Sequence, residues 1–254
     1  MIMASDRYPA FSKAKLLIIV FWFLETIVMR AIPSVSRLVY WSKYNYYKTP
    51  RWSIVKLFDN YAENFDEHLI QNLEYHTPSY LAEFIDSNAS IATPLNRVLD
   101  LGCGTGLLGL ALAKQFNIER LIGVDLSWKM LKKSQARAIY NELHNADLLE
   151  HLRNNNYTYD LIAAADVFIY IGELKAVMVE IHRLLKPNGY LAFSVERIDN
   201  GTFELTSAGR FQHSLNYLHR LSTEVGFSSI KCNAVSLRKE HNVMVPGYLI
   251  LIAK

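Results

Sequence analysis

Short apolar runs alternate with segments that are apolar on one helical face along most of the chain after residue 96. The runs have the length of buried strands, and the one-sided segments have the spacing of amphipathic helices. This alternation predicts an α/β fold with a doubly wound, seven-stranded, mostly parallel sheet and an antiparallel edge. We expect strands at 98–101, 121–125, 139–144, 159–165, 190–195, 230–237 and 247–253, and helices at 107–115, 128–138, 173–185 and 214–225.

The first predicted strand leads directly into a glycine loop, because residues 98–106 read VLDLGCGTG. Gly102, Gly104 and Gly106 stand at alternate positions, where the lack of side chains lets the backbone approach a ligand closely. The following helix presents free N–H groups and the positive end of its dipole, which suit a carboxylate. We therefore expect a ligand with an anionic group at this loop.

Acidic residues follow the next three strands at the same edge of the predicted sheet. Asp125 ends the second strand, where a carboxylate is able to accept hydrogen bonds from both hydroxyls of a ribose. Asp147 lies in a polar loop, where an aspartate by itself is most often a solvated turn residue. Asp166 follows the fourth strand, and in open α/β sheets such strand ends line the ligand crevice. The order of loop and carboxylates favours a bound ligand over an empty glycine turn.

A dinucleotide-binding unit also joins a strand and a helix by a glycine loop, but its fingerprint is G-x-G-x-x-G. The loop here reads G-x-G-x-G, with Asp100 two residues before the first glycine. It resembles the first motif of class I S-adenosylmethionine-dependent methyltransferases. The resemblance implies S-adenosylmethionine as cofactor, with Asp147 at the adenine and Asp166 facing the transferable methyl group. The expected cofactor-binding residues are Asp100, Gly102, Cys103, Gly104, Gly106, Asp125, Leu126, Asp147, Leu148, Asp166, Tyr61 and Phe65.

A closer resemblance covers about four fifths of the chain, from Leu57 to the end. This part is similar to predicted methyltransferases that in other proteins follow tetratricopeptide repeats. Residues 58–69 and 205–218 carry the resemblance, and residues 237–240 with 245–247 add to it. The 34-residue helical repeats themselves are absent from the residues before this region, so no repeat-mediated protein contact is implied.

Residues 52–95 form a segment before the core with apolar helical faces. We expect it to lie over the crevice as a lid, which would exclude water and complete the site. Tyr61, Phe65 and His68 are its candidate contacts to cofactor or substrate. The alternative is that Phe65 belongs to the core and His68 is a surface or capping residue.

The segment before the helix at 214–225 supplies candidate catalytic residues. His213 is the candidate base or orienting residue, and Tyr217 stands one helical turn further on. Arg210 has the geometry to hold an acidic group of the substrate, and Asp166 completes the catalytic set. The alternative is that His213 caps its helix and Arg210 is solvated. A carboxylate acceptor would need no base, whereas a hydroxyl or amine would.

Composition adds few constraints. The net charge of +3 combines +6 in residues 1–51 with −3 in the remainder, which disfavours a nucleic acid substrate for the predicted core at 96–254. Two cysteines are too few for a disulfide framework and have no zinc-ligand company, so we expect Cys103 and Cys232 to be buried free thiols and no metal site.

The basic extension at 1–51 contains an apolar run at 16–29, about 21 Å long as a helix and therefore shorter than a hydrocarbon core of about 30 Å. Aromatic and basic residues between 37 and 52 are typical of a membrane interface. We expect a cytoplasmic protein held at a membrane surface through residues 14–52. A secretory signal, an organelle presequence and a true start at Met29 are the alternatives.

The sequence thus predicts a methyltransferase that acts on an oxygen or nitrogen of a small or lipid-like acceptor. One alternative is a non-catalytic, membrane-associated assembly or binding factor that retains the fold, since fold does not fix function. Protein methylation is a further alternative.

Overall fold

The computed structural model describes residues 48–63, 65, 75–240 and 242–254. The predictions for residues 1–47 and for His68 lie outside the described residues. Within the described part, no helix combines the length and apolar character needed to cross a bilayer.

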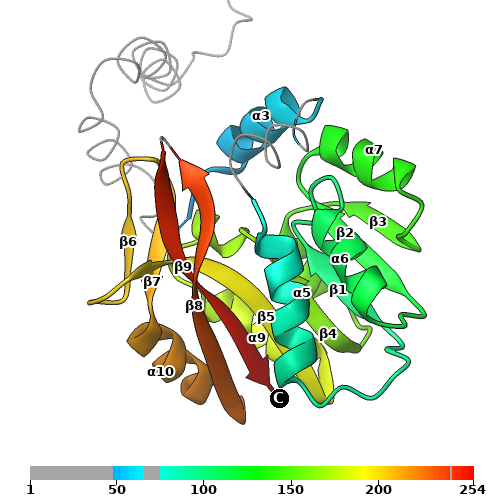
Figure 1. The fold of residues 1–254 in the computed structure, drawn as a ribbon. Helices are drawn as coiled ribbons and strands as arrows, with labels where there is room; N and C mark the ends of the chain where they lie inside the picture. The colour runs from blue at the N-terminus through cyan, green and yellow to red at the C-terminus, as the bar shows by residue number, and fades with distance from the viewer. Residues whose placement is uncertain (1–47, 64, 66–74, 241) are drawn as a thin grey trace, which may run out of the picture. The chain divides into compact units, whose positions relative to one another are not determined.

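Nine strands form one sheet in the described part of the chain, and seven of them correspond to the predicted strands (Figure 1). The order β3-β2-β1-β4-β5 is parallel throughout, while β9 is antiparallel to both β5 and β8. The predicted mostly parallel α/β sheet is confirmed. The strands are β1 (Val98–Leu101), β2 (Leu121–Asp125), β3 (Glu142–Asn145), β4 (Tyr159–Ala164), β5 (Leu185–Ile198), β6 (Phe203–Leu205), β7 (Phe211–Ser214), β8 (Ser229–Glu240) and β9 (Val243–Ala253).

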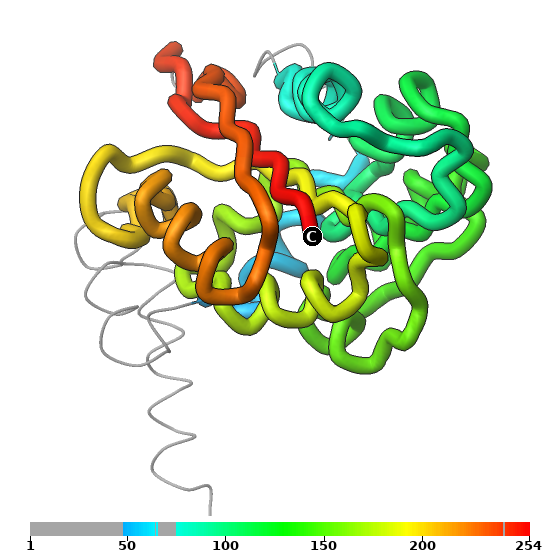
Figure 2. Tube along the Cα trace, turned by 90° about the horizontal axis from the view of Figure 1, so that it is seen from below, coloured from blue at the N-terminus to red at the C-terminus, as the bar shows by residue number. Residues whose placement is uncertain are grey.

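Each face of the sheet carries its own apolar core, because successive strand residues point to opposite faces. Leu99 and Ile162 pack with α8, α9 and α10, whereas their neighbours Val98 and Leu161 pack with α5 and α6. Figure 2 shows α5 and α10 on opposite sides of the last strand. The helices are α3 (Arg51–Tyr61), α5 (Thr77–Asn88), α6 (Leu107–Gln115), α7 (Trp128–Ala136), α8 (Leu148–Asn154), α9 (Lys175–Leu184) and α10 (Leu215–Val225), with a 3-10 turn, η2, at Phe168–Tyr170.

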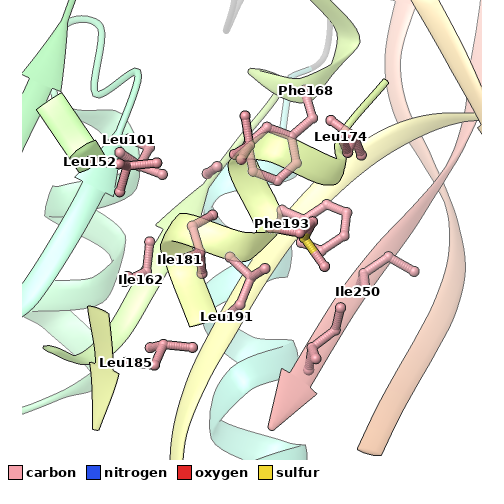
Figure 3. Packing of buried hydrophobic residues seen from close by; sticks show 14 of the residues in the cluster. Leu101, Leu152, Ile162, Phe168, Leu174, Ile181, Leu185, Leu191, Phe193 and Ile250 are labelled. Carbon is pink, nitrogen blue, oxygen red and sulfur yellow. The ribbon is translucent and has the colours of Figure 1, made fainter. Parts of the chain in front are cut away.

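The larger core lies between α9 and strands β4, β5 and β9 (Figure 3). Phe168 and Phe193 pack with ring centroids 4.9 Å apart. Ile181 of α9 is fully buried, whereas Val179 on the same helix is 46% exposed. The burial of α9 therefore follows the one-sided apolar pattern that predicts it.

Two additions distinguish the sheet from the predicted one. Strand β5 continues to Ile198, beyond its predicted end, and its last residues pair with β7 in parallel. Strands β6 and β7 form a hairpin at 203–214. The hairpin joins the sheet along the part of β5 that extends past the end of β4. The prediction missed this hairpin because its strands are only three and four residues long. Such short segments carry too few alternations to be recognised.

The free cysteines differ in burial. Cys103 is buried as expected, but Cys232 is exposed, so the prediction for Cys232 is wrong. The reason is its place on β8, the edge strand, where residues 231–234 are all exposed.

His213 on β7 joins the hairpin to the turn that follows η2. The side chain is fully buried, and its Nε2 lies 3.0 Å from the carbonyl oxygens of both Ile171 and Gly172. Because both partners are acceptors, Nε2 carries the hydrogen. Burial lowers the pKa of His213 to about 4, although the two carbonyls act in the opposite direction. His213 is therefore neutral in the folded protein at neutral pH.

We expect Ile181→Ala to lower the free energy of unfolding by about 2 to 5 kcal/mol, because it leaves a cavity in a closely packed core. Val179→Ala is the matched control on the exposed face of the same helix, with an expected change within about 0.5 kcal/mol. Urea denaturation of both variants measures the difference. Equal effects would contradict the assignment of the buried face of α9.

We expect His213 to make the protein less stable as the pH falls from about 6.5 toward about 4. In this range the unfolded chain binds a proton that the buried neutral ring does not. His213→Gln retains an N–H donor but does not titrate. The stability advantage of the wild type over this variant should shrink by roughly 2 to 3 kcal/mol between pH 7.5 and 4.5. Denaturant titrations at the two pH values measure it, and a constant difference would contradict the prediction.

Candidate active site

A cleft of about 580 Å³ opens at the carboxyl ends of β1, β2 and β4. This is where parallel α/β sheets bind ligands, and the volume lies within the usual range for ligand sites. Its walls come from the glycine loop, from α3 and from the last residues of β8. Asp125, Asp147 and Asp166, which follow or end β2, β3 and β4, also line it. Eleven of the twelve expected cofactor-binding residues line it, and Gly106 does not.

The glycine loop has the backbone that its sequence predicts. Gly102 and Gly104 have φ angles of +65° and +54°, which side chains rarely tolerate. A Cβ at Gly102 would stand 2.5 Å from the Val167 side chain, so this glycine lets the end of β4 close against the loop. A Cβ at Gly104 would meet nothing, which leaves that part of the loop open. Gly106 acts instead as the N-cap of α6.

Asp100 lies beneath the loop and is 1% exposed. Its Oδ2 accepts a hydrogen bond of 2.6 Å from the Tyr140 hydroxyl. Its Oδ1 has no partner within the described residues, although the side chain lines the cleft. Burial raises the pKa of Asp100 to about 7, and the Tyr140 hydroxyl opposes this rise. An unsatisfied buried acceptor is costly, so this oxygen is suited to a ligand that brings a donor.

Asp125 is placed by the end of β2 and held by two backbone groups. Oδ2 accepts from the Gly104 N–H at 2.9 Å and Oδ1 from the Ser127 N–H at 2.8 Å. Burial raises its pKa, while these two N–H donors favour the ionised form. Each carboxylate oxygen retains further acceptor capacity on the cleft side. The two hydrogen bonds hold the carboxylate in place and leave some of its acceptor positions unused.

Asp147 is more heavily engaged than the sequence suggested. Its Oδ1 caps α8 by accepting from the N–H groups of Leu149 and Glu150. Its Oδ2 lies 2.7 Å from Lys48 Nζ and 2.8 Å from Arg51 Nε. Burial acts to raise the pKa of Asp147, but the bond and charge of Lys48 hold it below its ordinary value. The cations that sequence analysis assigned to a membrane interface therefore pair with this carboxylate.

Helix α3 lies beside the cleft, and Tyr61 and Phe65 line it. Asp59 on this helix accepts a hydrogen bond of 2.5 Å from Ser127, which caps α7. Phe58 packs edge-on against Tyr170, with ring centroids 5.8 Å apart. Helix α3 is thus tied to the cap of α7 and to η2, and its role as a lid stays a prediction.

A buried ionic cluster closes the other end of the cleft. Arg238 contacts Asp166 Oδ2 at 3.2 Å, Glu240 Oε1 at 2.7 Å and Glu196. Arg210 contacts Glu196 Oε1 at 2.7 Å and also Glu240. We name these five residues the ionic cluster. All of them except Glu196 line the cleft.

The predicted catalytic residues divide into two groups. Asp166 and Arg210 line the cleft, whereas His213 and Tyr217 do not. The Tyr217 hydroxyl accepts from the Leu174 N–H at 2.8 Å, and His213 binds the two carbonyls described above. Their catalytic roles stay predictions, and the geometry favours a structural role because both side chains are engaged in the core. His213 thereby positions Ile171, which does line the cleft.

Sequence reasoning missed Tyr75, Arg238 and Glu240, which line the far end of the cleft. Tyr75 is hydrogen-bonded to Asp166, and its pKa is raised well above the ordinary value by burial and then by that carboxylate. Tyr75 lies outside the quoted motifs, and Arg238 and Glu240 lie in the segment 237–240, to which the resemblance assigned no role in the site. Only the pairing of β8 with β9 brings Arg238 to Asp166, 72 residues earlier in the chain.

Residues 98–189 match the family model of a methyltransferase domain. The chain is 32% identical over 145 residues to the biotin biosynthesis bifunctional protein BioCD of Bordetella avium, covering 57% of this chain and 30% of that protein. It is 29% identical over 142 residues to the malonyl-[acyl-carrier protein] O-methyltransferase of Bacillus cereus, covering 55% and 51%. The chain therefore spans between about a third and about half the length of these curated relatives.

Among solved structures, the fold is similar to phosphoethanolamine N-methyltransferase 2 of Haemonchus contortus in complex with phosphomonomethylethanolamine and S-adenosylhomocysteine. The TM-score is 0.56 at 16% identity, over 69% of this chain and 52% of that one. At this identity the likeness concerns the fold. The closer resemblance to methyltransferases that follow tetratricopeptide repeats stays a prediction. Residues 98–189 thus match a methyltransferase domain, and the fold around them is similar to that of a methyltransferase solved with S-adenosylhomocysteine.

Proposed function

We propose that this chain is an enzyme that transfers a methyl group from S-adenosylmethionine to a nitrogen or oxygen of a small acceptor. The observation that carries the proposal is the Oδ1 of Asp100, a buried oxygen without a partner among the described residues, on a residue that lines the cleft. The ammonium group of a methionine tail supplies the missing donor, and the open backbone at Gly104 leaves room for that tail.

The neighbouring residues suit the remaining parts of the cofactor. Asp125 offers its free acceptor sites to the two ribose hydroxyls. Leu126 and Leu148 line the cleft and offer apolar contact to the adenine ring. Asp147 is already paired with Lys48 and Arg51, so we assign it a smaller part in adenine recognition than its position in the motif order implied.

Bound S-adenosylmethionine supplies an electrophilic methyl carbon on a positively charged sulfur. The chain has to align the acceptor with that carbon, since the transfer is an in-line displacement. Asp166 precedes Val167, which packs on Gly102, so Asp166 is the member of the ionic cluster that adjoins the glycine loop. This position fits a residue that orients the acceptor beside the methyl group.

The lid limits the access of water to this reaction. Helix α3 is tied to α7 through Asp59, and Arg51 at its start is tied to α8 through Asp147. Tyr61 and Phe65 then cover the cofactor end of the cleft with aromatic rings. Exclusion of water protects the sulfonium from side reactions.

The relatives leave both acceptor atoms open, because one is named an O-methyltransferase and the other an N-methyltransferase. Attachment to a membrane through residues 14–52 stays a prediction. Within this range, Lys48 and Arg51 are committed to Asp147 rather than free for lipid headgroups.

Calorimetric titration of the full chain tests the cofactor assignment. We expect S-adenosylmethionine and S-adenosylhomocysteine to bind, and Asp125→Ala to weaken both by about 1.5 to 3 kcal/mol through lost hydrogen bonds to a charged acceptor. Asp199→Ala, at an exposed carboxylate, is the matched control and should bind as the wild type does. No binding by the folded wild-type chain would overturn the proposed function.

We expect cofactor binding to release a proton at pH 6.5. Burial raises the pKa of Asp100 to about 7, so most of the free protein is protonated there, and an adjacent ammonium favours the carboxylate. About half a proton or more should be released per bound S-adenosylmethionine, seen as a dependence of binding enthalpy on the buffer's ionisation enthalpy. Asp100→Asn should abolish the release. The same enthalpy in every buffer would contradict an ammonium site at Asp100.

A further inference from the structure

The ionic cluster determines what kind of acceptor group fits at the far end of the cleft. It contains the carboxylates of Asp166, Glu196 and Glu240 and the guanidinium groups of Arg210 and Arg238. With all five ionised, the cluster has one negative charge more than it has positive charges. Tyr75 and Tyr170, which also line this end, add no charge near neutral pH, because burial raises the pKa of each phenol.

The positive groups of the cluster are already bound. Arg238 is 5% exposed, and each of its three nitrogens contacts a different carboxylate. Two nitrogens of Arg210 are held by Glu196 and Glu240. Breaking such a pair would leave a buried carboxylate without compensation, which is strongly unfavourable. An anionic acceptor would therefore meet Asp166 and Glu240 rather than a free guanidinium.

The acceptor oxygens of the cluster are, by contrast, available. Asp166 accepts from the Ser194 hydroxyl at Oδ1, from Arg238 at Oδ2 and from the Tyr75 hydroxyl, which leaves about one of the roughly four acceptor positions of an ionised carboxylate. The side chain of Glu240 is 26% exposed and lines the cleft. A positively charged donor group gains hydrogen bonds to both residues and neutralises the excess charge.

We propose that the methyl acceptor is an amine, bound as its ammonium form by Asp166 and Glu240, and that carboxylate acceptors are disfavoured. The proposal rests on the proposed function and specifies its substrate class. The ammonium first gives one proton to a carboxylate of the cluster. Its nitrogen lone pair then forms the bond to the methyl carbon while the carbon–sulfur bond breaks. The electron pair of that bond stays on sulfur, and S-adenosylhomocysteine leaves as a neutral thioether.

The experiment compares three probes that share one alkyl chain: hexylamine, hexan-1-ol and hexanoate. Each is titrated by calorimetry at pH 7.5 into the full chain saturated with S-adenosylhomocysteine. We expect hexylamine to bind at least about tenfold more tightly than hexan-1-ol, because its ammonium group forms charged hydrogen bonds with the carboxylates of Asp166 and Glu240. Hexanoate should bind more weakly than the alcohol. Equal or tighter binding of hexanoate, or no binding of hexylamine, would overturn the proposal.

Two variants locate the effect. Glu240→Gln preserves size but removes one negative charge and one of the two acceptor oxygens, and it should lower the affinity for hexylamine about tenfold with little change for hexan-1-ol. Glu224→Gln makes the same change at an exposed carboxylate on α10 and should have no effect. If Glu240→Gln fails to bind S-adenosylhomocysteine, Asp166→Asn serves as the second variant. An unchanged amine preference in the variant that still binds S-adenosylhomocysteine would place the amine elsewhere and overturn the assignment.

Binding of S-adenosylhomocysteine is measured first in the same cell, which separates the two hypotheses. Its absence in the wild type refutes the proposed function. Its presence together with a preference for hexanoate refutes only the amine assignment.

Discussion

The cleft depends on one constraint: carboxylates buried at the ends of parallel strands need hydrogen-bond or ionic partners. Asp100, Asp125, Asp147 and Asp166 all lie at this edge of the sheet, and each needs partners because burial penalises its charged form. Asp147 finds two cations, Asp166 finds Arg238 and a serine, and Asp125 finds backbone N–H groups. Among the described residues, Asp100 has Tyr140 as the donor to one of its oxygens and no partner for the other. The proposed function places the ligand at this oxygen.

The same constraint explains how segments outside the central sheet are attached. Lys48 and Arg51 bring the start of α3 to Asp147, and Asp59 holds that helix to the cap of α7. Arg238 brings the end of β8 to Asp166 and Glu196, although these residues are distant in sequence. The segments that supply partners for the buried carboxylates thus also form walls of the cleft. The proposed cofactor end and the proposed acceptor end of the cleft are lined by different parts of the chain.

His213 illustrates how a residue with catalytic chemistry takes a structural role. Burial keeps the imidazole neutral, although the two carbonyls that accept its hydrogen favour the charged form. Through these bonds it holds Ile171 at the cleft and joins the small β6–β7 hairpin to the core. Its influence on the site is therefore positional.

The sequence by itself determined the central fold and the cofactor loop. Val98, Leu99 and Leu101 read as a buried strand, and the glycines that follow require a backbone that few other residues adopt, so these features are local. Sequence reasoning missed the hairpin at 203–214 because its strands are very short. It missed the ion pairs of Asp147 and the exposure of Cys232 because these depend on contacts with distant parts of the chain and on the edge position of β8. Only the tertiary structure decided that Arg238 meets Asp166, because strand pairing across 72 residues sets that contact and no spacing pattern records it. The acceptor end of the site is made of such long-range pairs, whereas the cofactor end follows consecutive strand ends that the sequence displays in order.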